Sequence, residues 1–227
     1  MNYREMRLHY HFFHVIVRPL FKALFKFEVF GYENVPTSGG VLLMMNHASY
    51  FDPIFIGAAV KRNLHYMARS TLFKPGFIRW FLLNMNAFPV NLGSPDRSAI
   101  KKALQILEEG KVLLIFPEGT RTIDGNLQKA QDGVGFIAYR TKACVIPVYL
   151  DGSRKVLPRG AKIPKTGKVT VSFGKPIDMD YFRKKEPSRE TYAQIGEEIM
   201  FRIAELMRER HSQKKFVVIK NEGNTCR

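Results

Sequence analysis

Seven apolar or alternating segments recur along this chain, and most are separated by stretches with helical spacing. The strand-like segments lie near residues 27–32, 40–46, 64–69, 86–91, 112–116, 144–150 and 168–174. The helix-like stretches lie near residues 53–60, 71–84, 96–109, 128–140 and 188–211. Several of the strand-like segments are rich in Val, Ile and Phe, and turn residues stand at many of their ends, which is typical of strands. This alternation predicts an α/β fold, in which helices flank a mixed, largely parallel sheet of about seven strands.

The net charge of +16 is high for a chain of 227 residues. The length suits a single domain that can bury a core, and an apolar fraction of 45% argues against disorder. The excess of positive charge predicts an anionic partner, which could be nucleic acid, acidic phospholipid or a phosphorylated small molecule. Composition alone does not choose among these three.

The cysteines and histidines do not form the patterns of a disulfide framework or a metal site. Cys144 lies in an apolar run and Cys226 lies next to the C-terminus, so a reducing compartment is expected. The six histidines do not have the spacing of zinc ligands. We therefore expect neither a metal nor a cofactor.

Residues 6–30 are rich in Phe, Val, Leu and Ile, yet they are not expected to cross a membrane. Arg18, Lys22 and Lys26 interrupt the apolar stretches, whereas a spanning helix needs about 20 mainly apolar residues. No small-residue cleavage site follows them, so a signal peptide is not expected either.

The same segment has the pattern of an amphipathic helix. Its basic and histidine side chains recur every three or four residues, at Arg7, His11, His14, Arg18, Lys22 and Lys26. Its apolar face carries Phe13, Val17, Leu20 and Leu24. Such a helix suits the headgroup region of an anionic membrane, although helices of this kind more often pack on their own domain. Pro19 is expected to kink the helix or to split it in two.

These patterns divide the chain into three parts. Residues 1–26 are predicted to form the amphipathic segment at the membrane interface, and the high net charge favours this interpretation over packing on the domain. Residues 27–211 are predicted to form the α/β domain. Residues 212–227 are a tail to which the sequence assigns no role.

A histidine and an aspartate stand close together after the apolar run at 40–46. His47 belongs to a turn-like string that ends at Asp52, and polar residues in this position lie outside the carboxyl ends of strands, where α/β folds place their working groups. Asp52 can fix the tautomer of an imidazole and stabilise its charged form. It could instead cap a helix that begins at Pro53. For the two side chains to meet, His47 must lie in the turn before the helix and fold back over it.

A second polar cluster follows the apolar run at 112–116. Pro117 ends that strand, and Gly119 permits a tight turn. Arg121 could hold a phosphate through two parallel hydrogen bonds. The alternative is a surface ion pair between Glu118 and Arg121, which would contribute little to stability.

Together, the two clusters resemble the conserved blocks of the glycerolipid acyltransferase family, which includes the 1-acylglycerol-3-phosphate acyltransferases. The string at 46–52, NHASYFD, is similar to the His-x4-Asp block, and the string at 116–121, FPEGTR, is similar to a very specific second block. Weaker similarities are found at Met67-Ala68-Arg69, Leu72-Phe73 and Val145-Ile146-Pro147-Val148. The matches fall in the right order from about residue 31 to 176.

The resemblance implies transfer of a fatty acyl group from a thioester to the hydroxyl of a lysophospholipid at a membrane. His47 would be the general base and Asp52 would orient it, with no covalent enzyme intermediate, so Ser49 is interpreted as a turn residue. Arg121 would bind the phosphate of the acceptor. Glu118, Gly119 and Thr120 would shape that site.

One block departs from the family pattern. The family commonly has an arginine soon after an apolar strand, where this chain has Leu92. Arg97 is the nearest cation that could take its place. Lysophosphatidic acid is the acceptor that the resemblance implies. Because this block is linked to the phosphate of the acceptor, its departure keeps a lyso-ornithine lipid or another lysophospholipid open as the alternative.

The resemblance also implies the partners and the location of the protein. The donor would be acyl-CoA or an acylated acyl carrier protein, and the protein would bind an anionic membrane surface on its cytoplasmic face. A nucleic-acid-binding domain would explain the charge, but no known basic-aromatic module or zinc signature supports one. A non-catalytic membrane adaptor derived from the family should have lost the pair His47 and Asp52, which is present here.

Overall fold

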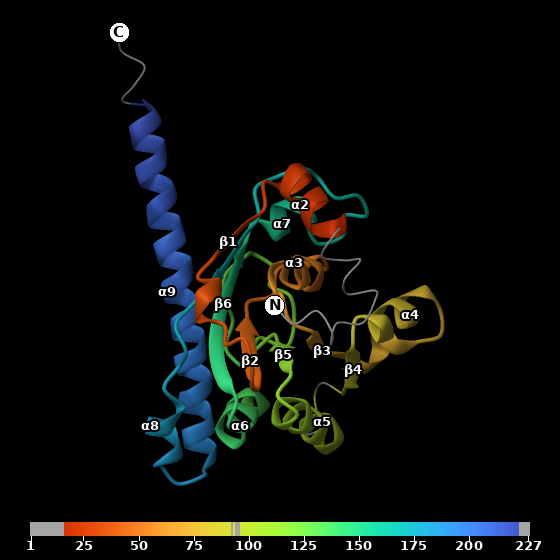
Figure 1. Ribbon diagram of the computed structural model, residues 1–227, viewed down its shortest axis with the longest axis vertical. Coiled ribbons are helices and arrows are strands. Elements are labelled where there is room, and N and C mark those ends of the chain that lie inside the picture. Colours follow the sequence, from red (N-terminus) through yellow and green to blue (C-terminus); the bar gives the residue numbers. More distant parts are fainter. Residues whose placement is uncertain (1–15, 92, 94–95, 223–227) are drawn as a thin grey trace.

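The computed structural model describes residues 16–91, 93 and 96–222. At its centre these residues form a seven-stranded sheet with the strand order β1-β7-β6-β2-β5-β3-β4 (Figure 1). The strands are β1 (Glu28–Phe30), β2 (Val41–Met45), β3 (Leu64–Arg69), β4 (Ala87–Val90), β5 (Val112–Ile115), β6 (Cys144–Asp151) and β7 (Thr170–Phe173). Only β6 and β7 pair in the antiparallel sense within this sheet. The prediction of a mixed, largely parallel sheet of about seven strands is therefore confirmed.

The helices of the described residues occupy most of the predicted positions. They are α2 (Arg18–Phe25), α3 (Asp52–Ala59), α4 (Phe77–Asn84), α5 (Arg97–Glu108), α6 (Asp132–Arg140), α7 (Ser153–Val156), α8 (Met179–Arg183) and α9 (Arg189–Glu222), with 3₁₀ turns η3 (Tyr32–Asn34) and η4 (Ser70–Phe73). The stretch predicted as one helix at 71–84 is divided, because η4 and α4 are separated by Lys74-Pro75-Gly76. The predicted end of the last helix at 211 is wrong, since α9 continues to Glu222.

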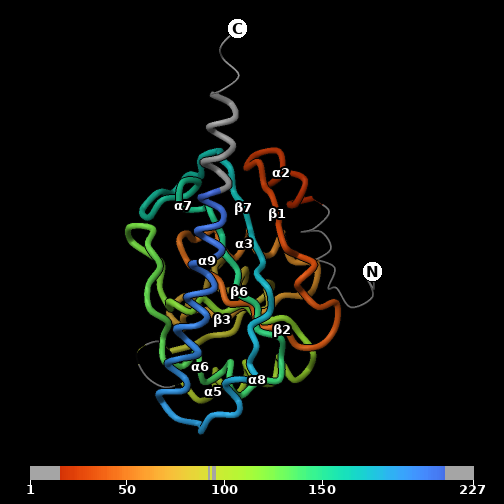
Figure 2. Tube along the Cα trace, turned by 90° about the vertical axis from the view of Figure 1, so that its left-hand side faces the viewer, coloured from red at the N-terminus to blue at the C-terminus, as the bar shows by residue number. Residues whose placement is uncertain are grey.

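The sheet is covered on both faces, which explains why its strands read as continuous apolar runs. Side chains of β2 alternate between two core clusters, with Leu43 on one face and Leu42 on the other, and both are fully buried. The first cluster packs under α2, α3 and α7, and the second packs under α5, α6 and α9. Figure 2 shows α9 running along the outside of its layer. A three-layer α/β domain results.

Helix α2 packs on the domain through aromatic rings that the predicted apolar face did not include. Phe21 and Phe25 contact Phe55 of α3, with ring centroids 5.1 and 5.3 Å apart. By contrast, Leu20 and Leu24 are about half exposed (51% and 44%) and point away from this contact. The helix therefore has one face on its own domain and a separate apolar face in solvent.

The structure describes only part of the predicted helical face of basic and histidine side chains. The α-helix begins at Arg18, with Pro19 in its first turn, where a missing N–H costs no hydrogen bond. Lys22 is exposed, and Lys26 lies just beyond the helix in a left-handed conformation. Arg7 and Phe13 lie outside the described residues. No helix in the described part of the chain has the length and apolarity needed to cross a bilayer.

Candidate active site

The two polar clusters meet because β2 and β5 are parallel neighbours in the sheet. Met44 is paired with Ile115, so the turns that follow the two strands leave the same edge side by side. The imidazole of His47 stacks on the ring of Phe116, with centroids 3.9 Å apart and an interplanar angle of 18°. The backbone of His47 donates to Oε1 of Glu118 at 2.9 Å. Its carbonyl accepts from the Thr122 N–H at 2.9 Å, so the two loops form one unit.

Asp52 holds the turn around His47 with a single carboxylate oxygen. Its Oδ2 accepts from Nδ1 of His47 at 2.7 Å, from the Ala48 N–H at 2.6 Å and from the Ser49 N–H at 2.8 Å. Asp52 is fully buried at the first position of α3. The expectation that His47 folds back over the helix start is confirmed. The alternative capping role is wrong, because the carboxylate binds the preceding turn and caps none of the N–H groups of α3.

The hydrogen bond to Asp52 determines which ring nitrogen of His47 is available for chemistry. An ionised carboxylate can only accept, so Nδ1 carries a proton when the pair is in this form. In the neutral imidazole Nε2 is then an acceptor. No other residue in the described part of the chain forms a hydrogen bond with Nε2, and 17% of the His47 side chain is exposed. The arrangement suits a general base that takes a proton from a bound hydroxyl.

The remaining polar residues of this turn have structural partners. Asn46 exchanges two hydrogen bonds with the backbone of Leu150, at 3.0 and 2.8 Å, and so ties the turn to β6. Ser49 is buried, donates to the Leu157 carbonyl at 3.0 Å and accepts from the Phe51 N–H at 3.2 Å. The interpretation of Ser49 as a turn residue is confirmed.

The side chain of Glu118 accepts hydrogen bonds from backbone N–H groups of the site. Its side chain is buried, and while Oε1 accepts from His47, Oε2 accepts from the Gln128 N–H at 3.0 Å. Burial raises the pKa of the Glu118 carboxyl above its usual value, and the two backbone donors oppose this increase. The alternative of a surface ion pair with Arg121 is wrong. The Arg121 guanidinium instead lies over the ring of Tyr50, 3.4 Å from its centroid.

Gly119 gives the second loop its tight turn, as its sequence position predicted. Its φ of +69° lies in the left-handed region, and a Cβ at this position would come within 2.9 Å of the Gln131 side chain. Gln131 in turn donates from Nε2 to the carbonyl of Glu118 at 3.3 Å. The turn at Gly119 is therefore fixed in its conformation by Gln131.

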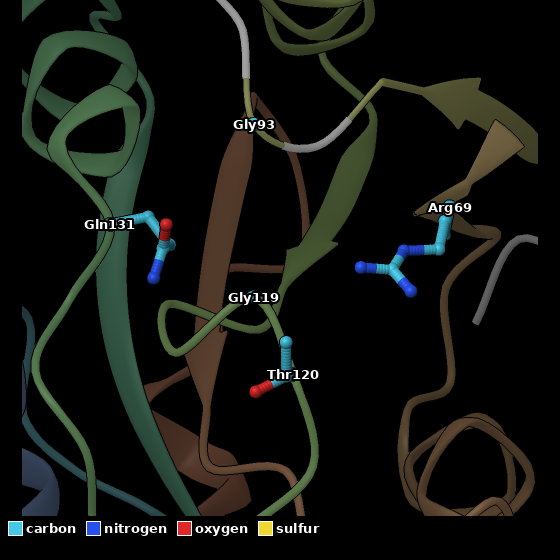
Figure 3. Close-up of a pocket in the computed structure, with 5 residues that line it drawn as sticks. All are labelled: Arg69, Gly93, Gly119, Thr120 and Gln131. Carbon is cyan, nitrogen blue, oxygen red and sulfur yellow. The ribbon is translucent and has the colours of Figure 1, made fainter.

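A cavity of about 240 Å³ borders this loop, lined by Arg69, Gly93, Gly119, Thr120 and Gln131. Figure 3 shows the Arg69 guanidinium pointing from one side toward Gly119 and Thr120, with Gln131 on the other side. An arginine over a turn of exposed backbone suits a phosphate or a carboxylate.

Arg69 is the functional candidate to which the sequence assigned no role. It is the last residue of β3, which runs parallel to β5, so it leaves the sheet at the same edge as His47. That strand-end position is the signal that could have identified it. Arg97, which was predicted to bind substrate, is exposed at the start of α5 and is not among the residues that line the cavity. Cys144 begins β6 at the opposite edge, and burial raises the pKa of its thiol.

Comparison with known proteins defines the class to which this fold and site belong. The family model described as Acyltransferase matches residues 26–151, which is more than half of the chain. A 1-acyl-sn-glycerol-3-phosphate acyltransferase of Bacillus subtilis is 33% identical over 180 residues, covering 79% of this chain and 87% of that protein. The chloroplastic enzyme LPAT1 of Arabidopsis thaliana is 28% identical over 73% of this chain and 49% of its own length.

A solved structure agrees with these matches. The crystal structure of PlsC, the 1-acyl-sn-glycerophosphate acyltransferase of Thermotoga maritima, superposes with a TM-score of 0.69 at 26% identity, covering 87% of this chain and 79% of that one. The chain belongs to the Acyltransferase family and is an acyltransferase.

Proposed function

We propose that this protein transfers a fatty acyl group from an acyl thioester to the free hydroxyl of 1-acylglycerol-3-phosphate, which produces phosphatidic acid. The observation that carries the proposal is the hydrogen bond between His47 and Asp52, beside the loop that holds Arg121. The relatives from Bacillus subtilis and Thermotoga maritima, which carry the name of this activity, support the choice of acceptor.

In the proposed reaction, Nε2 of His47 removes the proton of the acceptor hydroxyl as the oxygen attacks the thioester carbonyl. Asp52 stabilises the imidazolium that forms, since its carboxylate already accepts from Nδ1. When the tetrahedral intermediate collapses, the carbon–sulfur bond breaks and the thiolate takes the proton from the imidazolium. An oxygen ester and a free thiol are released, and no covalent enzyme intermediate forms.

The acceptor phosphate would be held between Arg69, which lines the cavity beside Gly119, and Arg121, which follows Gly119 by two residues in the same loop. In the structure the Arg121 guanidinium is stacked on the ring of Tyr50, outside the residues that line the cavity, so Arg121 would have to turn toward the phosphate when the acceptor binds. A guanidinium can bind a phosphate with two parallel hydrogen bonds, which positions the acceptor as well as attracting it. Glu118 accepts one backbone N–H group from each of the two loops and so holds them together.

Membrane association is part of the proposal, and α2 supports it. Leu20 and Leu24 in α2, together with Ile16 just before it, recur every four residues, and all three are exposed, so they form an apolar stripe. The neighbouring Lys22 adds positive charge that anionic headgroups attract. Helix α2 packs against α3, which begins at Asp52, so a bilayer that contacts α2 lies on the side of the sheet where the helix of the site begins. The cytoplasmic face is the side that suits a chain whose Cys144 is a free thiol.

Lysophosphatidic acid is the first choice of acceptor, and a different lysolipid is the second. The reason for keeping the second choice is Leu92, which stands where the family commonly has an arginine. A lysolipid with a different headgroup would not need that arginine. The donor can be acyl-CoA or an acylated carrier protein, because the basic surface suits both acidic molecules.

The proposal is tested by assaying the purified protein in vesicles with a panel of lysolipids, each with CoA and carrier-protein donors. We expect phosphatidic acid from lysophosphatidic acid to form fastest. Faster acylation of a lyso-ornithine lipid or of lysophosphatidylglycerol would correct the acceptor. No ester product with any pair would contradict the proposed function.

A further inference from the structure

The segment Ser70–Asn84, which comprises η4 and α4, exposes five large apolar side chains. Its exposed members are Leu72, Phe77, Ile78, Trp80 and Leu83. Phe77 and Trp80 are 75% and 60% exposed, and their rings stack with centroids 5.7 Å apart. Patches of this kind mark a surface that contacts a partner. The segment is also attached to the domain, because Phe73, Phe81 and Leu82 pack against the core.

The charges around this patch indicate what the partner is. The sequence contains no Asp or Glu between Asp52 and Asp96. The same interval carries five basic residues, Lys61, Arg62, Arg69, Lys74 and Arg79. Lys74 and Arg79 lie within the segment itself and are exposed. An aromatic and aliphatic surface whose own segment carries only positive charge complements an anionic bilayer, where Trp and Phe favour the headgroup boundary.

The position of the segment connects this surface to the site. Arg69, whose guanidinium lines the cavity, is immediately followed by η4. In Figure 1, α4 projects at the side of the domain beyond β3 and β4, separately from α2. We propose that η4 and α4 dock into the outer part of an anionic lipid leaflet, as a second membrane contact beside the cavity. A lysolipid could then reach Arg69 with its acyl chain still among the lipids; this last step rests on the proposed function, whereas the docking does not.

Trp80 is the only tryptophan in the chain and reports on this docking directly. Vesicles of phosphatidylcholine and phosphatidylglycerol are added to the full-length protein, and its emission is recorded. We expect a shift to shorter wavelength and quenching by lipids brominated on their acyl chains. Unchanged emission from protein that sediments with the vesicles would overturn the proposal. A blue shift that grows with protein concentration and needs no lipid would also overturn it, because a second copy of the chain would then cover α4.

A relocated tryptophan provides the matched control. Phe201 lies on α9 and is 48% exposed, so the variant Trp80→Phe/Phe201→Trp moves the probe to an exposed position on a different helix. This variant should bind vesicles as the wild type does while its emission escapes bromine quenching. Equal quenching at both positions would contradict a specific docking face.

A second pair of variants removes one aromatic ring without changing charge. Phe77→Ser should weaken binding to the vesicles by about tenfold, because its ring loses contact with the lipid. Tyr181→Ser, at a 59% exposed position on α8, should leave binding unchanged. Equal affinity of the two variants, with acyl transfer intact, would refute docking by α4 and leave the proposed function standing. Docking without any acyl transfer would have the opposite meaning.

Discussion

Two strand-end regions of this protein differ in the side chains that they bury and expose: one buries polar groups, and the other exposes apolar ones. The turn after β2 buries Asn46, Ser49 and Asp52, and each of them forms hydrogen bonds within the chain. The segment after β3 exposes the rings of Phe77 and Trp80. Both follow the ends of parallel strands in one sheet. Buried, hydrogen-bonded polar groups hold a geometry in place, whereas exposed apolar patches mark a contact surface. We therefore propose the first region for the chemistry and the second for its location at a membrane.

Among variants that leave the imidazole in place, Asp52→Asn should have the largest effect. An amide keeps an oxygen for the three donors but loses the negative charge that stabilises an imidazolium. We expect kcat to fall by about 10³-fold in the vesicle assay. The amide nitrogen would be buried where Oδ1 has no partner among the described residues, which should cost about 1–3 kcal/mol of unfolding free energy. Near-normal kcat would show that the charge of Asp52 is not needed.

Glu118→Gln should have the next largest effect. The carboxylate accepts one backbone N–H from each of two loops, and an amide can accept only one of them. Loss of one such bond, worth about 1.5–3 kcal/mol, should lower kcat by roughly 10- to 100-fold through misplacement of His47. The variant should bind vesicles normally. A change in acceptor KM alone would instead assign Glu118 to binding.

Replacement of the cavity arginine should affect binding of the acceptor more than turnover. Arg69→Gln removes a guanidinium next to Gly119, and we expect the KM for lysophosphatidic acid to rise by about tenfold with kcat little changed. Arg97→Gln is the matched substitution, because the sequence had assigned this role to Arg97. An increase in KM only in the Arg97 variant would restore that assignment and exclude Arg69.

The smallest effect is expected on the exposed stripe of α2. Leu24→Ser removes an apolar side chain that is 44% exposed, while Phe25, which contacts Phe55, stays in place. Vesicle binding should weaken by about threefold, with turnover of a water-soluble short-chain acceptor unchanged. Loss of turnover on the soluble acceptor would mean that α2 supports the site rather than the membrane contact.

The sequence predicts the sheet well because strands buried on both faces read as unbroken apolar runs. The segment expected at 64–69 is β3, with the same bounds, and the run at 112–116 differs from β5 by one residue. The end of α9 could not be predicted in this way. Its basic residues near 211 are a stop signal, yet no glycine or proline follows at once to end the helix.

The site was predictable where its residues are close in sequence. The spacing of His47 and Asp52 already requires a turn that folds back, and the hydrogen bond follows. The contact between His47 and Glu118 depends on β2 and β5 being neighbours, which no local pattern encodes. Arg69 was missed for the same reason, since its role depends on which strand ends lie together.

The most direct test of the account is the turnover of His47→Ala with lysophosphatidic acid and an acyl thioester in vesicles. Circular dichroism and vesicle sedimentation should match the wild type, because the backbone of residue 47 still donates to Glu118. We predict that production of phosphatidic acid falls by about 10³-fold or more. Turnover near that of the wild type in a folded, vesicle-bound variant would contradict a general-base role for His47.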